Sequence, residues 1–104
     1  MKTTGVQARA IIVTHIKKQK LLFSDLLKLQ SSFAHQKFAG KFNKPKALRR
    51  LGALGKRAAK DYNMMRGGYV IRLTKADKRE LATDIFNFIN TNSLDKITKL
   101  RKKC

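Results

Sequence analysis

The chain is 104 residues long, and its 25 lysines and arginines against six aspartates and glutamates give a formal charge of +19. This length fits one domain with a modest core, and a hydrophobic share of 42% argues against a wholly disordered chain. So much positive charge in a small body destabilises the compact state unless a polyanion supplies counter-charge. The phosphate backbone of a nucleic acid is the first candidate polyanion, and an anionic membrane is the second.

The first predicted helix begins near residue 22. Apolar residues recur there at the three- and four-residue steps of one helical face: Leu22, Leu26, Leu29 and Phe33. Leu21 and Leu27 widen this stripe, which predicts a helix buried on more than one side. The periodicity stops over residues 35–45, where Gly40 and Pro45 interrupt it.

A second helix is predicted from Asn43 onward, because asparagine is a good N-cap and Pro45 suits a first helical turn. Its apolar face consists of Leu48, Leu51, Leu54, Ala58 and Tyr62. Cations cover much of the remaining surface: Lys46, Arg49, Arg50, Lys56, Arg57 and Lys60. One face can therefore pack while the other binds phosphates. Gly52 and Gly55 each cost this helix roughly 1 kcal/mol relative to alanine, which indicates a close neighbour, either another helix or an RNA backbone.

The last third of the chain permits two interpretations. Residues 69–73 alternate in the manner of a β-strand after a pair of glycines. Thr74 and Asp77 have the spacing of a capping box, and an apolar stripe with helical spacing follows. Residues 83–91 nevertheless also fit a strand rich in β-branched and aromatic residues, with 74–82 as a loop. The pattern alone slightly favours a helix over a loop plus strand for 75–90 and leaves both open, and Ser93 is a suitable cap for a short basic helix over 94–103.

The sequence contains no recognisable catalytic or metal-binding arrangement. Cys104 is the only cysteine, so neither an internal disulfide nor a zinc cluster of thiols can form. His15 and His35 have no acidic or thiol cluster near them in sequence, and we interpret them as structural hydrogen-bonding residues. The acids nearest one another are expected to balance nearby lysines: Asp77, Glu80 and Asp84. We therefore expect no enzyme, no cofactor, no metal and no small-molecule substrate.

Part of the chain resembles the bacterial-type large-subunit ribosomal protein seventeen family. The residues that carry the resemblance most specifically are Leu54, Ala59, Tyr62 and the segment Gly67, Gly68, Tyr69 followed by Val70, Ile71, Arg72 and Leu73. Arg79 and residues 85–89 look like the family's loop arginine and closing strand, and residues 12–15 resemble the segment that precedes its first core helix. The Gly-Asp usual between the two strands is missing, and the basic N-terminal arm is short.

The resemblance implies an α+β fold, with basic helices packed on a small sheet that contains a hairpin of 69–73 with 83–89. The alternative is a mostly helical fold. One rRNA-binding domain is expected over 1–104, with short basic termini at 1–8 and 93–104 that are extended or locally helical. Gly67 and Gly68 are expected to form a turn that lets Tyr69 enter the sheet.

The functional hypothesis is a structural constituent of the large ribosomal subunit, bound to rRNA and to neighbouring ribosomal proteins. Its predicted phosphate-binding residues are Lys17, Lys18, Lys20, Lys46, Arg49, Arg50, Lys56, Arg57, Lys60, Arg66, Arg72, Arg101, Lys102 and Lys103. The divergence from the family indicates a mitochondrial location, with the cytoplasm or a plastid as alternatives. The rival hypothesis is a small DNA-binding or architectural protein. A membrane-active basic amphipathic protein is disfavoured, because the most basic helix also carries Gly52 and Gly55 and lacks tryptophan.

Overall fold

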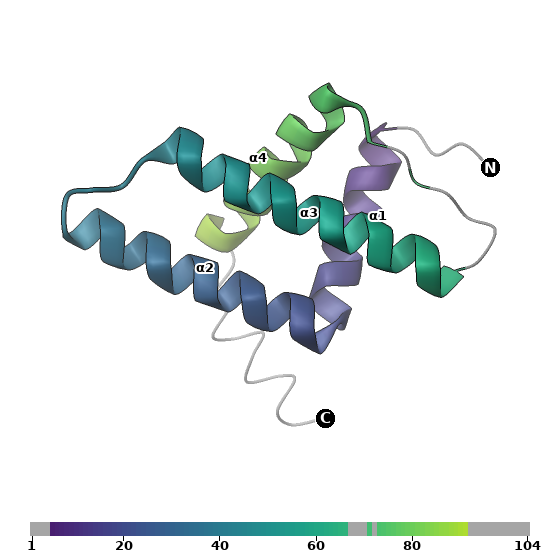
Figure 1. The fold of residues 1–104 in the computed structure, drawn as a ribbon, viewed down its shortest axis with the longest axis horizontal. Helices are drawn as coiled ribbons and strands as arrows, with labels where there is room; N and C mark the ends of the chain where they lie inside the picture. The colour runs from purple at the N-terminus through teal and green to yellow at the C-terminus, as the bar shows by residue number, and fades with distance from the viewer. Residues whose placement is uncertain (1–4, 67–70, 72, 92–104) are drawn as a thin grey trace.

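The computed structural model describes residues 5–66, 71 and 73–91, and it contains four helices in this part of the chain. They are α1 (Gly5–Lys18), α2 (Lys20–Phe38), α3 (Lys44–Arg66) and α4 (Lys75–Thr91). α2 and α3 run antiparallel beside each other, while α1 and α4 cross behind α3 (Figure 1). α3 packs against all three other helices. α1 does the same, and the contact of α3 with α4 is the most extensive of the fold.

The predicted hairpin of 69–73 with 83–89 is wrong. Residues 83–89 belong to α4, and the described residues include no strand, so the mostly helical alternative is the correct one. The reason is local: the backbone N–H of Thr74 donates to Asp77 Oδ2, and that of Asp77 donates to Thr74 Oγ1, both at 3.1 Å. This reciprocal capping box satisfies two backbone donors at the start of the helix.

Burial on α4 then follows the helical stripe rather than the alternation of a strand. Leu81, Ile85 and Phe88, at steps of four and three residues, are all buried. In a strand, residues an odd number of positions apart point to opposite faces, so Ile85 and Phe88 would not share one side. Three- and four-residue periodicity together with the cap therefore outweighs the β-type composition of this segment.

The predicted helix over residues 22–33 is confirmed as α2, but its predicted burial is partly wrong. Leu22, Leu26 and Phe33 are buried, whereas Leu21 is 81% exposed. The helix ends where Gly40 adopts φ +71°, with the Lys41 N–H donating to the Gln36 carbonyl at 2.8 Å. This left-handed glycine reverses the chain toward α3.

The predicted N-cap of α3 is confirmed. Asn43 Oδ1 accepts a hydrogen bond from the Lys46 N–H at 3.2 Å. The apolar stripe packs inward as expected, with Leu51, Leu54 and Ala58 buried. α3 thus presents its cationic side to solvent because its other side forms the middle of the core.

α1 joins α2 with only Gln19 between them, and Gln19 has an extended backbone (φ −92°, ψ 115°). Ile12 and Ile16 of α1 are fully buried. Residues 12–15 thus lie inside a helix, not ahead of one as the family resemblance implied. The predicted N-terminal segment 1–8 is helical from Gly5, and the other predicted terminal segment, 93–104, lies outside the described residues together with Cys104.

His15 is the one buried polar side chain of the described core, and its predicted structural role is confirmed. Its Nε2 lies 2.6 Å from Asp61 Oδ2, and its ring meets the Tyr62 ring edge-on at 5.4 Å between centroids. The contact joins α1 to the last turns of α3.

Candidate nucleic-acid interface

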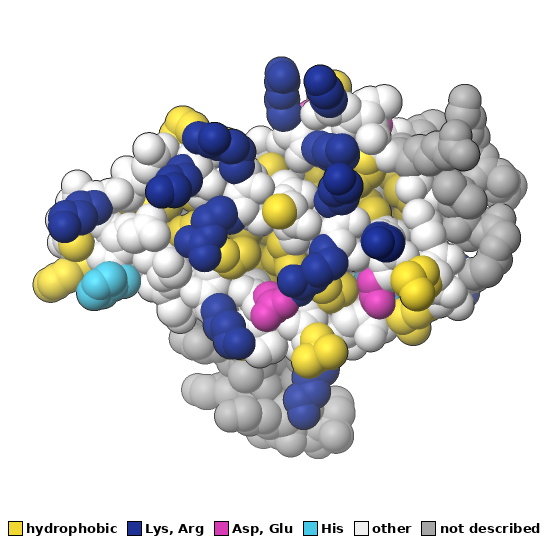
Figure 2. All heavy atoms as spheres, in the orientation of Figure 1, with side chains coloured by type: hydrophobic (Ala, Val, Ile, Leu, Met, Phe, Trp, Pro, Cys, Tyr) yellow, Lys and Arg dark blue, Asp and Glu magenta, His cyan; other side chains and the backbone are white. Residues whose placement is uncertain are grey.

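Positive charge gathers on the half of the molecule formed by α2, the α2–α3 connection and α3. Residues 26–60 contain ten lysines and arginines and no aspartate or glutamate. In Figure 2, Lys and Arg side chains spread across the face that α3 occupies, with few acidic side chains among them. A continuous cationic surface of this kind attracts a polyanion without any sequence code.

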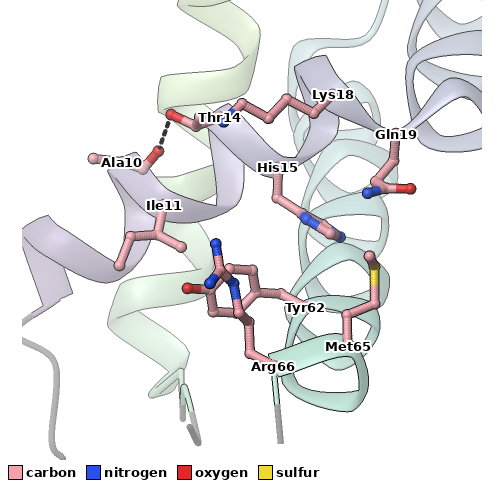
Figure 3. A pocket seen from close by; sticks show the side chains of 9 residues that line it. All are labelled: Ala10, Ile11, Thr14, His15, Lys18, Gln19, Tyr62, Met65 and Arg66. Atoms are coloured by element: carbon pink, nitrogen blue, oxygen red, sulfur yellow. Dashed lines mark hydrogen bonds between the residues drawn. The ribbon is translucent and has the colours of Figure 1, made fainter.

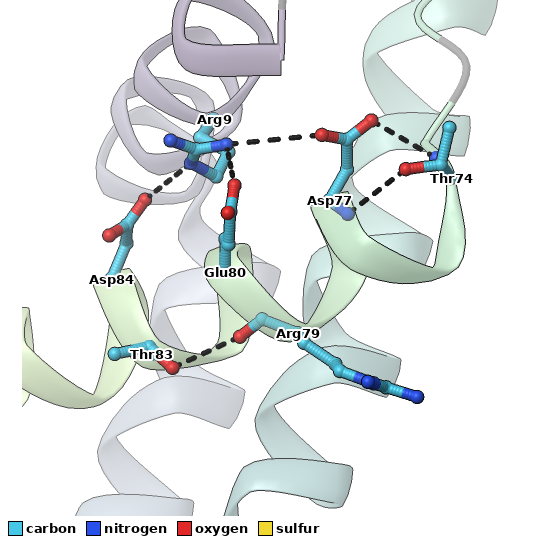
Figure 4. Close-up of polar contacts among 7 residues, drawn as sticks. All are labelled: Arg9, Thr74, Asp77, Arg79, Glu80, Thr83 and Asp84. Atoms are coloured by element: carbon cyan, nitrogen blue, oxygen red, sulfur yellow. Dashed lines mark hydrogen bonds and ion pairs between the residues drawn. The ribbon is translucent and has the colours of Figure 1, made fainter.

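Each acid of the described residues contacts a partner side chain, and most of these cations take no part in the contacts. Asp25 pairs with Arg57, and Asp61 contacts His15. The other three lie on α4 and surround one arginine of α1, Arg9. Its Nε is 2.9 Å from Asp84 Oδ2, and its Nη1 contacts Glu80 and lies 3.9 Å from Asp77 Oδ1 (Figure 4).

This arginine corrects the expectation that the three α4 acids balance nearby lysines. Asp77, Glu80 and Asp84 are spaced three and four residues apart, so they share one face of α4. That face is turned toward α1, and Arg9 is only 16% exposed there. The acids therefore neutralise a cation of another helix, and they do not neutralise the neighbouring cations of α4.

Those cations are Lys78 and Arg79, and they lie on the opposite side of α4 from the acids. Figure 4 shows the Arg79 side chain extending away from the Arg9 cluster. Both residues line a groove between α3 and α4. α4 thus separates its charges, with the negative side facing α1 and the positive side facing this groove.

The α3/α4 groove has a volume of about 570 Å³. Arg49 and Lys56 of α3 stand on one side, with Lys78 and Arg79 of α4 on the other. The rest of the lining is small or apolar apart from Thr83: Pro45, Leu48, Gly52, Ala53 and Ala82. No carboxylate lines it among the residues that the structure describes. The lining is therefore largely apolar, with positively charged residues on both sides of it.

The groove continues toward the C-terminal half of α3. A second hollow, of about 650 Å³, shares Lys56 and Lys78 with the groove and adds Lys60. Lys60 is exposed, as are Lys46, Arg49 and Lys56. From residue 46 to residue 60 a helix rises about 21 Å. The cationic side of α3 is therefore long enough to follow several successive phosphates.

Arg50 and Arg57 lie on the other flank of α3, toward α2. They line a hollow of about 400 Å³ together with Lys28 and Asp25. The ion pair of Arg57 with Asp25 reduces the charge that this flank offers to a ligand. Of the six predicted α3 cations, Arg49 and Lys56 line the groove and Lys60 lines the adjoining hollow. Arg50 and Arg57 lie on the partly neutralised α2 side, and Lys46 is exposed and lines none of these hollows.

The other described cations predicted to bind RNA lie outside the groove. Lys17 of α1 places its Nζ 4.7 Å from the centre of the Phe88 ring of α4. Lys18 and Arg66 line a separate pocket of about 400 Å³ between α1 and the end of α3, where Arg66 lies 5.8 Å from the Tyr62 ring (Figure 3). Lys20 is exposed at the start of α2.

The remaining predicted site residues lie outside the described residues. They are Gly67, Gly68, Tyr69, Arg72, Arg101, Lys102 and Lys103. Sequence reasoning also missed two groove residues as phosphate binders, Lys78 and Arg79. The helical spacing of the α4 acids was the signal for them, because it places both cations off the acidic face.

Comparison with protein-family models, with curated proteins and with solved structures gave no match. Within the described ranges, no three His, Cys, Asp or Glu side chains group so as to hold a metal ion. None of the described helices is long and apolar enough to cross a membrane.

Proposed function

We propose that this protein binds the phosphate backbone of RNA through the α3/α4 groove, as a structural constituent of the large ribosomal subunit. The observation that carries the RNA-binding part is the groove itself. Four cations from two helices line it beside small and apolar residues, and no described carboxylate competes for them. Lys and Arg in this arrangement neutralise phosphates and release condensed counterions.

The groove supports backbone binding rather than base reading. Most of its lining is apolar, and its charged groups are ammonium and guanidinium donors, which suit phosphate oxygens. Gly52 and Ala53 add almost no side-chain volume between the walls, so a sugar–phosphate chain can approach the surface of α3. Binding of this kind sets position and orientation on the nucleic acid without specifying its sequence.

The ribosomal part of the proposal is supported by the sequence resemblance, but the helical fold removes part of that resemblance. The counterpart at 85–89 is helical and no longer contributes. What remains is the spacing of Leu54, Ala59 and Tyr62 ahead of Gly67, Gly68 and Tyr69, together with the basic charge. In this proposal rRNA and neighbouring ribosomal proteins are the partners, and the divergence of the sequence favours a mitochondrial ribosome.

A charge-matched pair of double variants tests the site. Arg49→Gln with Lys56→Gln removes one wall of the groove, and Lys28→Gln with Lys75→Gln removes the same charge from exposed residues that neither line the groove nor belong to the predicted site. Anisotropy of a labelled RNA is measured across a salt series. The groove variant is expected to lower the slope of log K against log salt by about 2, and the control by less. Equal slopes for both variants would place binding outside the groove.

Two further measurements separate the ribosomal proposal from a DNA-binding function. The tagged protein is expected to co-sediment with large ribosomal subunits through a salt wash, and an RNA helix is expected to compete better than a DNA duplex of the same length. Preferential binding to DNA, with no protein in the subunit fractions, would support the architectural alternative instead.

A further inference from the structure

The end of the molecule where α2 passes into α3 carries two exposed rings. Phe38, the last residue of α2, is 93% exposed, more than any other large hydrophobic residue of the described chain. His35 lies three residues earlier and is also exposed. Residues three apart share one face of a helix, so the two rings are neighbours on the same surface.

Two lysines are anchored at this end by aromatic rings of the core edge. Lys37 Nζ lies 4.9 Å from the centre of the Phe42 ring and 5.7 Å from that of Phe86. Lys44 Nζ lies 5.5 Å from the Phe86 ring. Phe42 and Phe86 are themselves stacked, with centroids 6.3 Å apart. The stack thus holds two ammonium groups near a single ring.

These ammonium groups keep the capacity to bind an anion. No ion pair involves Lys37, Lys41 or Lys44 within the part of the chain that the structure describes. The nearest acids in sequence are Asp25 and Asp61, and each has a partner elsewhere. A ring attracts an ammonium through its π-face but does not neutralise its charge.

We propose that this end binds unpaired nucleotides of RNA, with Phe38 stacking on a base and Lys37 and Lys44 binding the adjoining phosphates. The inference rests on the proposed RNA-binding function and adds the form of RNA that is recognised. Bases inside a duplex are stacked on each other, so an exposed ring can take up only an unpaired or terminal base. Aromatic side chains beside a cationic path are a general way to hold single strands.

The site also gives the protein two different modes of contact. The groove holds backbone and is indifferent to pairing, whereas the Phe38 end requires a free base. Both surfaces adjoin α3, whose first turn carries Lys44 and whose middle turns form the groove wall. One RNA can therefore reach both where a helix ends in a loop or a single-stranded tail.

The chain contains no tryptophan, so Phe38→Trp introduces a single fluorophore of that type while keeping an aromatic ring. The probes are a single-stranded RNA octamer, a long RNA duplex with few terminal bases per nucleotide, and vesicles containing an anionic lipid. The octamer is expected to quench the fluorescence of the F38W protein strongly and the duplex to quench it weakly. A blue shift on vesicles without quenching by the octamer would overturn the proposal and identify a membrane surface.

Binding is measured in parallel with labelled RNA. Phe38→Ala is expected to weaken octamer binding about tenfold and to leave duplex binding unchanged. Leu21→Ala, which removes another exposed apolar side chain of α2 at its opposite end, is expected to change neither. If Phe38→Ala leaves octamer binding intact while groove variants still weaken duplex binding, this inference fails alone. If neither RNA binds the unaltered protein, the proposed function fails as well.

Discussion

A Cβ atom added at Gly55 of α3 would lie 2.5 Å from Leu81 Cδ2 of α4. The two helices approach closely here because Gly55 has no side chain, and Leu81 occupies the space and is fully buried. The glycine therefore serves helix packing, one of the two explanations that its position in the sequence permits. Gly52 differs: its added Cβ would stand 3.8 Å from Ala82 Cβ, an ordinary contact.

This difference predicts opposite effects of one substitution at two glycines. Gly55→Ala is expected to lower the free energy of unfolding by about 1–2 kcal/mol, because overpacking exceeds the gain in helix propensity. Gly52→Ala is expected to raise it by up to about 1 kcal/mol. Urea unfolding followed by circular dichroism measures both. A stabilised Gly55→Ala variant would contradict the close packing of α3 on α4.

The start of α4 provides a test of the capping box. Thr74→Ala removes the side-chain acceptor for the Asp77 N–H and is expected to cost about 1 kcal/mol. Thr83→Ala is the control, since its hydroxyl only bonds back to the Arg79 carbonyl within the helix, and its loss is expected to be nearly neutral. Thermal unfolding of the two variants makes the comparison. Equal stability would mean that the cap does not define this helix.

Arg9 is predicted to stabilise the fold, whereas Arg49 is predicted to serve binding. Arg9→Gln leaves three α4 carboxylates facing one another without their cation, and we expect a loss of about 1–2 kcal/mol in unfolding free energy. Arg49→Gln removes an exposed cation from a chain of charge +19 and is expected to leave stability unchanged or slightly raised. Arg49→Gln is expected to lower RNA affinity more than Arg9→Gln does. A destabilised Arg49→Gln variant would assign that arginine a structural role.

Salt is expected to stabilise the free protein. Raising ionic strength from about 10 mM to about 150 mM shortens the Debye length from about 30 Å to about 8 Å. This screens the repulsion among 25 cationic side chains more than it weakens the few ion pairs, so the melting temperature should rise. Differential scanning calorimetry without RNA tests this. A falling melting temperature would show that the ion pairs around Arg9 dominate.

Local hydrogen bonding explains which parts of the fold were predictable. The caps at Asn43 and Thr74 need only residues within a few positions, and both were visible in the pattern. The hairpin prediction was wrong because the family resemblance rests on residue types and their spacing along the chain. The prediction gave less weight to the capping box, which starts the helix over residues 75–91.

Burial and charge pairing depended on neighbours that the sequence does not reveal. Leu21 belongs to an apolar stripe but is exposed, because no other helix covers that side of α2 in the described residues. Arg57 was grouped with the other α3 cations, although the α2 acid Asp25 pairs with it. Lys78 and Arg79 line the groove only because α4 packs against α3, which the sequence does not show.

The sequence by itself determined the charge, the class of polyanion that such charge attracts, and the ends of the helices whose caps are local. The tertiary structure decided which cations act together. Ion pairs between helices depend on packing, and Arg9 of α1 pairs with the three acids that share one face of α4. The cations on the other side are left to face α3, and that separation of charge makes the groove.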